Sequence, residues 1–412
     1  MLLKGPETII FDNKSPVATM YTLTEEANLV ELSDIQRQEE KEHTMVATTK
    51  LIADLGNGRP LGGCFTPDNS ILYIADAILG LTRIQNPTNP TSKVEIVTTT
   101  AMDNENGDAK LTKVNFADDV VVGPVTGNVY FTEASEVLPE RNIDTGVWDV
   151  MYPSKIELLS GKRSGRLLMY NPTTDETTVL AKGLLFGNGI SIDQVNEEYV
   201  VFAETYAIRI GKYYLTGDKA GTLEYIVDGS PLPACKISFC LCLCMFCGLF
   251  VCWAERERER EERREILGAT LPDTLLTLLF CNLSMFFHGK DIDGVDCAKK
   301  ALSPSGDAST RYCYAALPSN VVAASKILYK VPHPFDMFFR MLIMMLPKSL
   351  LPKVGPYGGV AVINPETGTV VDILQDPRGT DIMYIMGVTA QGDKLYLGSL
   401  YNTFVGVYDL AK

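Results

Sequence analysis

Four oxygen-bearing side chains stand at the same place in a short pattern that recurs along the chain. A residue that is often polar is followed by a small or polar residue and an apolar run, and the four are Glu7, Asp118, Asn188 and Asp293. Three carboxylates and a carboxamide around one axis would repel one another if left bare, and a hard divalent cation relieves that repulsion. Oxygen-only ligands favour calcium or magnesium, and calcium tolerates an irregular cage better. We therefore predict one calcium ion held by these residues, the alternative being that each caps a strand or turn.

A bound cation polarises a carbonyl group, but hydrolysis also needs a base that activates water. Asp119, directly after Asp118, is the candidate base, and its alternative role is to orient that ligand. The three histidines lie elsewhere, at His43 in a charged loop, at His288 near an anomalous stretch, and at His333 between two prolines. His333 is the weaker alternative base, because its surroundings favour a turn.

The pattern that carries these residues starts six repeats, and its other two occurrences begin at Leu61 and Met386. A second strand of a common type follows most starts. Third and fourth strands are also visible, for example in Gly165–Tyr170 and Thr177–Leu180. Four antiparallel strands repeated around an axis make a propeller blade, so we expect an all-β, six-bladed β-propeller formed as a single domain by residues 1–412. A β-sandwich explains the strands but not their recurring order of four.

Residues 317–351 interrupt the repeat between strands of the fifth blade. The run Met337–Leu346 is rich in Met and Phe and predicts a helical excursion at the propeller rim. Such a helix either covers the core as a lid or contacts a membrane.

Residues 235–287 form an anomalous insertion between blades four and five. Ile237–Ala254 is apolar and rich in cysteine, and Glu255–Glu261 alternates strictly between Glu and Arg. A repeated GA dinucleotide encodes such an alternation, so we interpret the segment as a retained intron or a mispredicted exon. The alternative is a transmembrane helix with a charged flank. Because most of the cysteines lie in or beside this segment, cysteine usage leaves the redox compartment open.

The composition of the chain limits the kinds of molecule it is expected to bind. The chain has 412 residues, of which 46% are hydrophobic, and a formal net charge of −14. This is enough apolar material for a sizeable core, and the acidity argues against nucleic acid, which needs a basic surface. The sequence begins without a recognisable secretory signal, so the compartment is not assigned, and neither is the oligomeric state. Membrane association would come from the insertion or from an anchor that precedes the first residue.

Several motifs resemble the strictosidine synthase-like family. They are Gly5–Asp12, Gly58–Gly62, Leu72–Ala77, Tyr130–Thr132, Leu185–Gly189 and Lys394–Leu400. Tyr329–Pro334 and Pro356–Gly359 resemble its animal-type branch, the adipocyte plasma membrane-associated proteins. The resemblance implies a six-bladed propeller similar in fold to the paraoxonase-type calcium-dependent lactonases. Family members carry a signal or anchor before the Gly-Pro-Glu segment, so the strand that closes the ring from the N-terminal side is expected to be largely missing.

The resemblance also implies an activity. In the lactonase relatives, matching acidic and amide positions hold calcium, and a histidine serves as base near the start of blade two, where this chain has Leu61. In strictosidine synthase a catalytic glutamate precedes the last Leu-Tyr-x-Gly motif, and its expected place here falls at or near Met386. We therefore expect an arylesterase-like, calcium-dependent hydrolase of small esters or lactones. The alternatives are a non-catalytic propeller that binds a ligand or partner and, third, a Pictet–Spengler synthase, which would lack its carboxylate.

Overall fold

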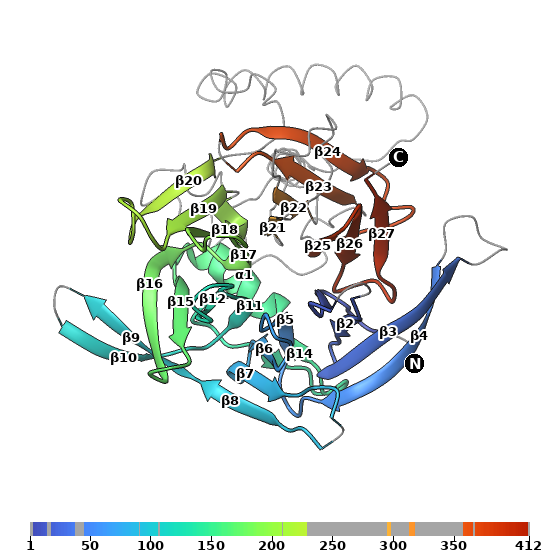
Figure 1. Cartoon of the computed structure of the whole chain (residues 1–412), viewed down its shortest axis with the longest axis horizontal. Helices are drawn as coiled ribbons and strands as arrows, with labels where there is room; N and C mark the ends of the chain where they lie inside the picture. The colour runs from blue at the N-terminus through green and yellow to red at the C-terminus, as the bar shows by residue number, and fades with distance from the viewer. Residues whose placement is uncertain are drawn as a thin grey trace, which may run out of the picture.

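A ring of antiparallel sheets around a central channel forms the molecule (Figure 1). The structure, a computed structural model, describes residues 3–14, 18–37, 45–89, 91–105, 108–207, 209–228, 295–297, 313–317, 357–365 and 367–410. The ring has six blades, so the predicted six-bladed β-propeller is confirmed. The predicted insertion at 235–287 and the predicted helix at 337–346 lie outside the described residues.

The first three blades each contain four strands that pair in chain order from the channel outward. They are β1 (Ile9–Phe11), β2 (Met20–Leu23), β3 (Asn28–Arg37) and β4 (Met45–Asp54) in blade one; β5 (Pro60–Phe65), β6 (Ile71–Asp76), β7 (Gly80–Gln85) and β8 (Val94–Thr98) in blade two; and β11 (Ala117–Val122), β12 (Val129–Glu133), β15 (Gly165–Asn171) and β16 (Glu176–Leu184) in blade three. A hairpin of β9 (Thr100–Glu105) and β10 (Asp108–Lys113) extends the third sheet outward.

Blades four and five follow the same plan, and blade six has three described strands. The strands are β17 (Gly187–Ile192), β18 (Tyr199–Glu204), β19 (Arg209–Tyr214) and β20 (Leu223–Asp228) in blade four, with the short 3₁₀ helix η1 (Thr205–Ala207); β21 (Val295–Cys297), β22 (Cys313–Leu317), β23 (Gly358–Ile363) and β24 (Val370–Asp376) in blade five; and β25 (Gly387–Gln391), β26 (Lys394–Gly398) and β27 (Gly406–Asp409) in blade six. Cys313 is disulfide-bonded, and the Cys64 thiol of blade two donates to the Phe65 carbonyl at 3.5 Å.

The core is a series of apolar clusters between neighbouring blades. Tyr73 and Leu81 of blade two pack with Val120 and Phe131 of blade three, and equivalent clusters join the other neighbours. Strands such as β12 and β18 are almost entirely buried because both faces of a blade contact another blade. This packing fixes the inner strands, which contact one another around the channel in the order β1, β5, β11, β17, β21, β25 and back to β1.

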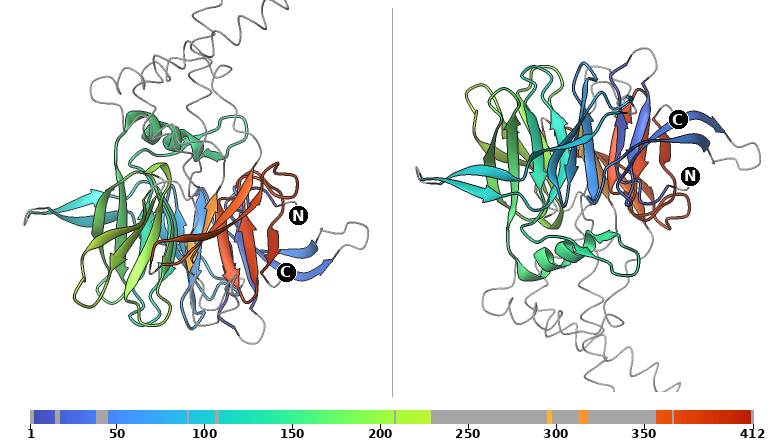
Figure 2. Two further views of the ribbon diagram at one scale, coloured as in Figure 1. Left: turned by 90° about the horizontal axis from the view of Figure 1, so that it is seen from above. Right: turned by 90° about the horizontal axis from the view of Figure 1, so that it is seen from below.

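The described α-helix lies in blade three, in a segment without a strong helical pattern. Between β12 and β15 the chain forms β13 (Glu140–Arg141), β14 (Trp148–Asp149) and α1 (Met151–Ser160), which stand off one face of the ring (Figure 2). The Asp149 carboxylate accepts the N–H of Met151 at the start of α1, and Gly161 ends it with φ of 72°. Within the described residues, no helix has the length and apolar character needed to cross a membrane.

Strand direction determines which face carries the long connections. Because antiparallel strands alternate in direction, the second and fourth strands of a blade end where its inner strand begins. The α1 excursion joins a second strand to a third, as do residues 318–357, and residues 229–294 join a fourth strand to an inner one. The described excursion with α1 therefore leaves the ring at the face where the inner strands start, here called the channel mouth.

Blades six and one meet at a seam without a shared strand in the described residues. Blade six has three strands in the part of the chain that the structure describes. The Pro6 carbonyl accepts the N–H of Ser399 at 2.9 Å, and the Thr389 hydroxyl donates to the Ile9 carbonyl at 2.8 Å. A Cβ added to Gly398 would lie 1.7 Å from the Glu7 carbonyl oxygen, so the close approach at the seam requires glycine.

Candidate functional site

Three consecutive inner strands begin with an irregularity at the channel mouth. The pairing register shifts between Pro60 and Gly62 in β5, between Ala117 and Val120 in β11, and between Gly187 and Ile190 in β17. A β-bulge leaves extra residues out of the ladder and changes where their side chains point, and bulges often occur beside functional sites. The bulged segments contain the predicted ligands of blades three and four.

The structure brings together part of the predicted calcium ligands. Asp118 and Asn188 are 4% and 7% exposed at the starts of β11 and β17, which are neighbours in the ring. Glu7 is half-buried just before β1, and blade two lies between it and Asp118. The side-chain oxygen of Asn188 accepts the N–H of Gly189 at 2.8 Å. Asp293 lies outside the described residues.

The donor chemistry of this set suits a hard cation, because every side chain in it offers oxygen. Among the residues that the structure describes, no three His, Cys, Asp or Glu side chains gather into a group that would hold a metal ion. The predicted cage therefore depends on the amide of Asn188 and on Asp293 as well as on two described carboxylates. Calcium remains a prediction that rests on this donor set.

Asp119 joins blade three to blade four. Its carboxylate accepts the N–H of Val120 at 2.9 Å and the N–H of Ile190 at 3.0 Å. Its own N–H donates to the Thr132 hydroxyl, which in turn donates to the Asn188 carbonyl at 2.7 Å. The candidate base is thus beside the predicted ligands, and both of its oxygens accept main-chain hydrogen bonds. His333, the alternative base, lies outside the described residues.

Blade two contributes no side-chain oxygen at its start, and Gly62 there lets Asp119 approach closely. A Cβ on Gly62 would lie 2.2 Å from a carboxylate oxygen of Asp119. Leu61 packs instead into an apolar cluster at the mouth, together with Phe116 and Phe186. These two rings meet edge to face at 5.7 Å between centroids. The start of blade two is therefore apolar where the lactonase relatives were expected to carry their base.

The α1 excursion packs on the same apolar cluster. Val150 and Leu158 contact it, and the Ser154 hydroxyl hydrogen-bonds to that of Tyr206. Glu157 is 1% exposed. Its carboxylate accepts hydrogen bonds from the Ser135 hydroxyl at the start of the excursion and from the hydroxyl and N–H of Ser164 at its end. The excursion is consequently fixed against the mouth rather than loosely attached.

Arg59 is the residue at this site that sequence reasoning missed. It directly precedes β5 and is 3% exposed, although arginine is rarely so buried. Its place in Gly58–Gly62 was noted only as part of a motif. The signal available in the sequence was its position two residues before Leu61, where the repeat of blade two starts.

Several buried acids have structural roles. Asp76, Glu133 and Glu204 end the second strands of blades two, three and four, and each accepts the N–H of a residue that leads into its own blade's inner strand. Burial raises the pKa of the carboxyls of Asp76 and Glu133, against the opposing effect of these hydrogen bonds. Part of the acidity of the chain is thus explained by the fold.

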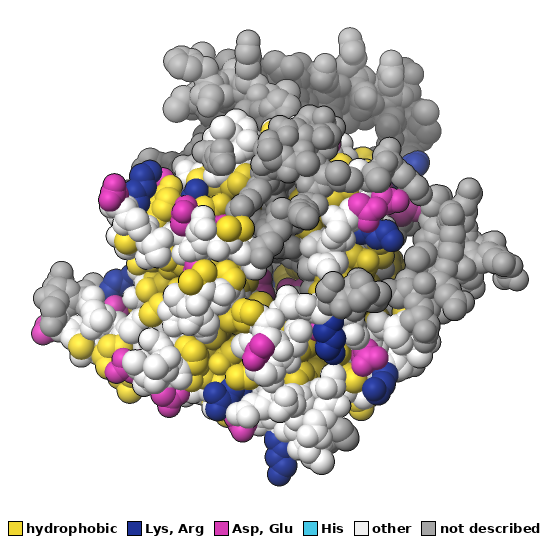
Figure 3. Space-filling view, viewed as in Figure 1, with side chains coloured by type: hydrophobic (Ala, Val, Ile, Leu, Met, Phe, Trp, Pro, Cys, Tyr) yellow, Lys and Arg dark blue, Asp and Glu magenta, His cyan; other side chains and the backbone are white. Residues whose placement is uncertain are grey.

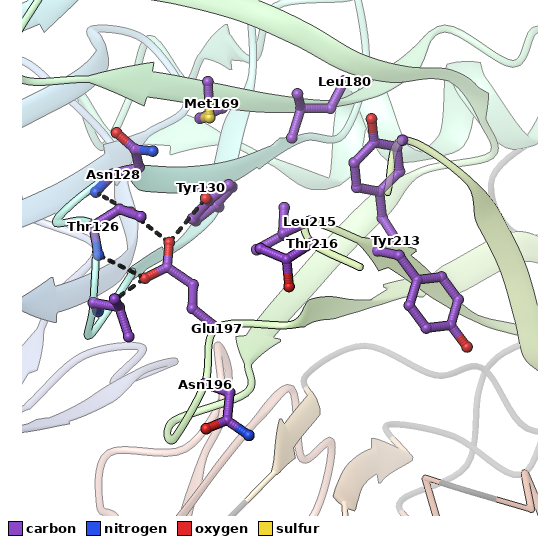
Figure 4. A pocket seen from close by; sticks show the side chains of 13 residues that line it. Thr126, Asn128, Tyr130, Met169, Leu180, Asn196, Glu197, Tyr213, Leu215 and Thr216 are labelled. Carbon is purple, nitrogen blue, oxygen red and sulfur yellow. Dashed lines mark hydrogen bonds between the residues drawn. The ribbon is translucent and has the colours of Figure 1, made fainter. Parts of the chain in front are cut away.

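A cavity of about 300 Å³ lies between blades three and four, at the turns opposite the mouth (Figure 4). Met169, Leu180 and Tyr213 supply apolar walls, and Glu197 is buried at one side. The Glu197 carboxylate already accepts hydrogen bonds from Thr126 and Tyr130, as well as from the N–H of Val125. None of the predicted site residues lines this cavity. The centre of the ring is also hollowed, and acidic side chains are visible inside it (Figure 3).

Known proteins resemble the chain at the level of family. Residues 118–218 match the family model for strictosidine synthase. Protein STRICTOSIDINE SYNTHASE-LIKE 3 of Arabidopsis thaliana is 27% identical over 353 residues, which cover 86% of this chain and 67% of that protein. The adipocyte plasma membrane-associated protein of Gallus gallus is 32% identical over 174 residues, covering 42% of this chain and 37% of that protein.

Two further comparisons differ in coverage. The adipocyte plasma membrane-associated protein Hemomucin of Drosophila melanogaster is 36% identical over 175 residues, and the match covers 42% of this chain and 27% of that protein. Most of these matches thus span well under half of the relative's own length. Among solved structures, a gluconolactonase from Xanthomonas campestris covers 97% of this chain and 85% of its own, with 9% identity and a TM-score of 0.47. A similarity of that size says nothing about activity.

Proposed function

Because the chain is a six-bladed propeller whose resemblance to the strictosidine synthase-like family is confirmed, we propose that it is a calcium-dependent hydrolase of small esters or lactones. The observation that carries the proposal is the gathering of oxygen-bearing side chains where inner strands start at one face of the ring. Asp118 and Asn188 are buried there in adjacent bulged strands, and Glu7 lies at the same face. Bulges that redirect such side chains suit a binding site better than a regular ladder does.

The proposed roles follow from the donor set. Glu7, Asp118, Asn188 and Asp293 would hold the ion, which when bound supplies an electrophile for the carbonyl of an ester or lactone. Asp119 would accept the proton of the attacking water. The apolar cluster at the mouth, with Leu61 and the excursion beside it, suits a substrate with an apolar body such as an aryl ester.

The test combines binding with turnover. We expect chelation of calcium to lower the melting temperature of the full chain, and re-addition to restore it, since a ligand bound only by the native state stabilises it. Asp118→Ala should abolish that response. Hydrolysis of small aryl esters and lactones should be weak and should depend on calcium. Unchanged melting with a chelator, in a folded protein, would end the calcium proposal.

A non-catalytic propeller that binds a ligand or partner is the second candidate. It is favoured by two observations, the engagement of both Asp119 oxygens with main-chain N–H groups and the apolar side chain of Leu61 at the start of blade two. If calcium binds and the fold is intact, but no ester or lactone in a broad panel is hydrolysed, this reading replaces the first. Condensation of tryptamine with an aldehyde is not expected, because no glutamate occurs between Ile382 and Lys394.

A further inference from the structure

A buried guanidinium lies at the channel mouth. Arg59 is 3% exposed, and one of its terminal nitrogens donates to the Pro60 carbonyl at 3.3 Å. Its Nε is also buried and makes no hydrogen bond to the residues that the structure describes. An arginine cannot shed its proton in a protein, so this position carries a permanent positive charge.

The fold places this charge between acidic strand starts. Strand β5, which begins one residue after Arg59, is flanked in the ring by β1 and β11, and Glu7 and Asp118 stand at the starts of those two strands. Burial lowers the pKa of Arg59, and four carboxylates attract its charge and oppose that effect: those of Glu7, Glu25, Asp76 and Asp118. Two predicted calcium ligands therefore have a cation of the protein beside them.

The four carboxylates are not equivalent. Asp76 already accepts hydrogen bonds from the main-chain N–H groups of Arg59, Ile78 and Leu79, at 2.8 to 3.0 Å. These hydrogen bonds stabilise its negative charge, and two of them come from the turn between β6 and β7. Glu7 and Asp118 are the two of the four that are predicted calcium ligands, so a divalent ion would share their charges with Arg59. One fixed positive charge next to two carboxylates leaves a site with less net negative charge, and the affinity of an oxygen site for calcium depends on that charge.

We infer that Arg59 is a built-in counter-cation that sets how strongly the mouth carboxylates bind a divalent ion. The guanidinium neutralises Glu7 and Asp118 in part, which allows Asp118 to be buried and Glu7 to be half-buried without an ion and weakens the site for calcium. Arg59 is thereby an affinity-determining residue and not a ligand. The inference rests on the calcium site proposed above, and the experiment separates the two.

The experiment measures calcium affinity by isothermal titration calorimetry on the full chain, with melting in chelator as a second readout. Arg59→Met removes the charge at similar length, Arg59→Gln removes it but keeps hydrogen-bond donors, and Arg59→Lys keeps it. Both neutral variants should bind calcium about tenfold more tightly than the parent, and Arg59→Lys should remain close to the parent. Arg83→Met is the matched control, because Arg83 pairs with Glu95 on a partly exposed strand of the same blade. The Arg83→Met variant should bind calcium with the same affinity as the parent.

The outcomes are distinguishable. Binding that appears only in the neutral variants supports the inference and rejects calcium use by the natural protein. Binding in the parent that the neutral variants leave unchanged or weaken overturns the inference and retains the calcium proposal. The absence of binding in every folded variant rejects both. If the neutral variants fold only with calcium present, the ion replaces the missing charge and the inference stands; if they fold in neither condition, the role of Arg59 is structural and the inference fails.

Discussion

The carboxylate of Asp119 in blade three accepts the main-chain N–H of Ile190 in blade four, with 3.0 Å between the two atoms. The second oxygen of the same carboxylate accepts the N–H of Val120. One carboxylate thus accepts hydrogen bonds from main-chain N–H groups in two bulged strands, where the bulges take these donors out of the regular ladder. A residue that sequence reasoning selected as a base therefore also has a structural role.

Asp119→Asn is expected to lower the free energy of unfolding by about 1–3 kcal/mol, because the amide offers one acceptor where the carboxylate offers two. Urea denaturation followed by circular dichroism measures the change. Asp144→Asn, in an exposed turn, is the control and should be neutral. Turnover of the Asp119→Asn variant must be compared per folded molecule. If the variant keeps full hydrolytic activity, Asp119 is not the base. Unchanged stability would show that the bond between blades contributes little.

Glu197→Gln should destabilise the joint between blades three and four by about 2–3 kcal/mol. The carboxylate is 2% exposed and accepts hydrogen bonds from the N–H groups of Val125 and Thr126 and from the Tyr130 hydroxyl. Hydrogen bonds to a charged acceptor are stronger than those to a neutral one. The NH₂ group of a glutamine would also face the N–H and O–H donors that the carboxylate now accepts. Glu198→Gln, at the exposed neighbour, is the matched control for chemical denaturation. Equal stability of the two variants would contradict this role for Glu197.

Glu157 should make stability depend on pH near its site. Burial raises its pKa above the ordinary 4.5, against the opposing hydrogen bonds from Ser164 and Ser135. The folded state therefore holds the Glu157 proton more tightly than the unfolded state does. The contribution of this group is fully present below pH 4.5 and is lost as the pH rises through the raised folded value.

Glu157→Gln provides the comparison, since glutamine does not titrate. The free energy of unfolding of the parent, minus that of the variant, should decrease as pH rises from about 4.5 toward neutrality. Denaturation curves at several pH values measure the difference. Glu176→Gln, on an exposed strand end, should track the parent without a trend. A difference that rises with pH would show that the hydrogen bonds outweigh burial.

Removal of the insertion should leave the propeller intact. Joining Pro233 to Asp291 deletes the apolar and Glu-Arg segments, which lie outside the described residues, and keeps both flanking strands β20 and β21. An apolar run exposed to water favours aggregation, and the closure entropy of a loop changes only slowly with its length. We expect a higher soluble yield with the same circular dichroism spectrum. A deletion variant that fails to fold while the full chain is soluble would make the segment structural.

The blades were predictable because their signal is local. Short apolar strands bounded by turn residues repeat often enough to be counted, and the starts at Asp118 and Asn188 were placed correctly on inner strands. The helix α1 was missed because Val150 at its N-terminus provides no side-chain cap, although Gly161 marked its end.

The charge balance of the site was not predictable, because it depends on residues distant in sequence. Glu7, Arg59 and Asp118 come together only when blade two is inserted between blades one and three. Counting acids at strand starts indicated a bare cluster that required a metal. The neighbouring arginine becomes visible as a compensating charge only in the folded ring. Likewise, the two hydrogen bonds that the Asp119 carboxylate accepts depend on bulges in β11 and β17, which no local sequence pattern predicts.

The seam between blades six and one bears on how the ring opens. Every other blade has at least four described strands, but the described part of blade six has three. Its inner strand meets blade one through side-by-side packing and hydrogen bonds such as that from the Thr389 hydroxyl to the Ile9 carbonyl. A circular structure resists unfolding only as well as its weakest joint, because opening one joint turns a closed ring into an arc whose end blades lose neighbours. Amide protons of β25 and β1 should therefore exchange with solvent before those of β12 or β18.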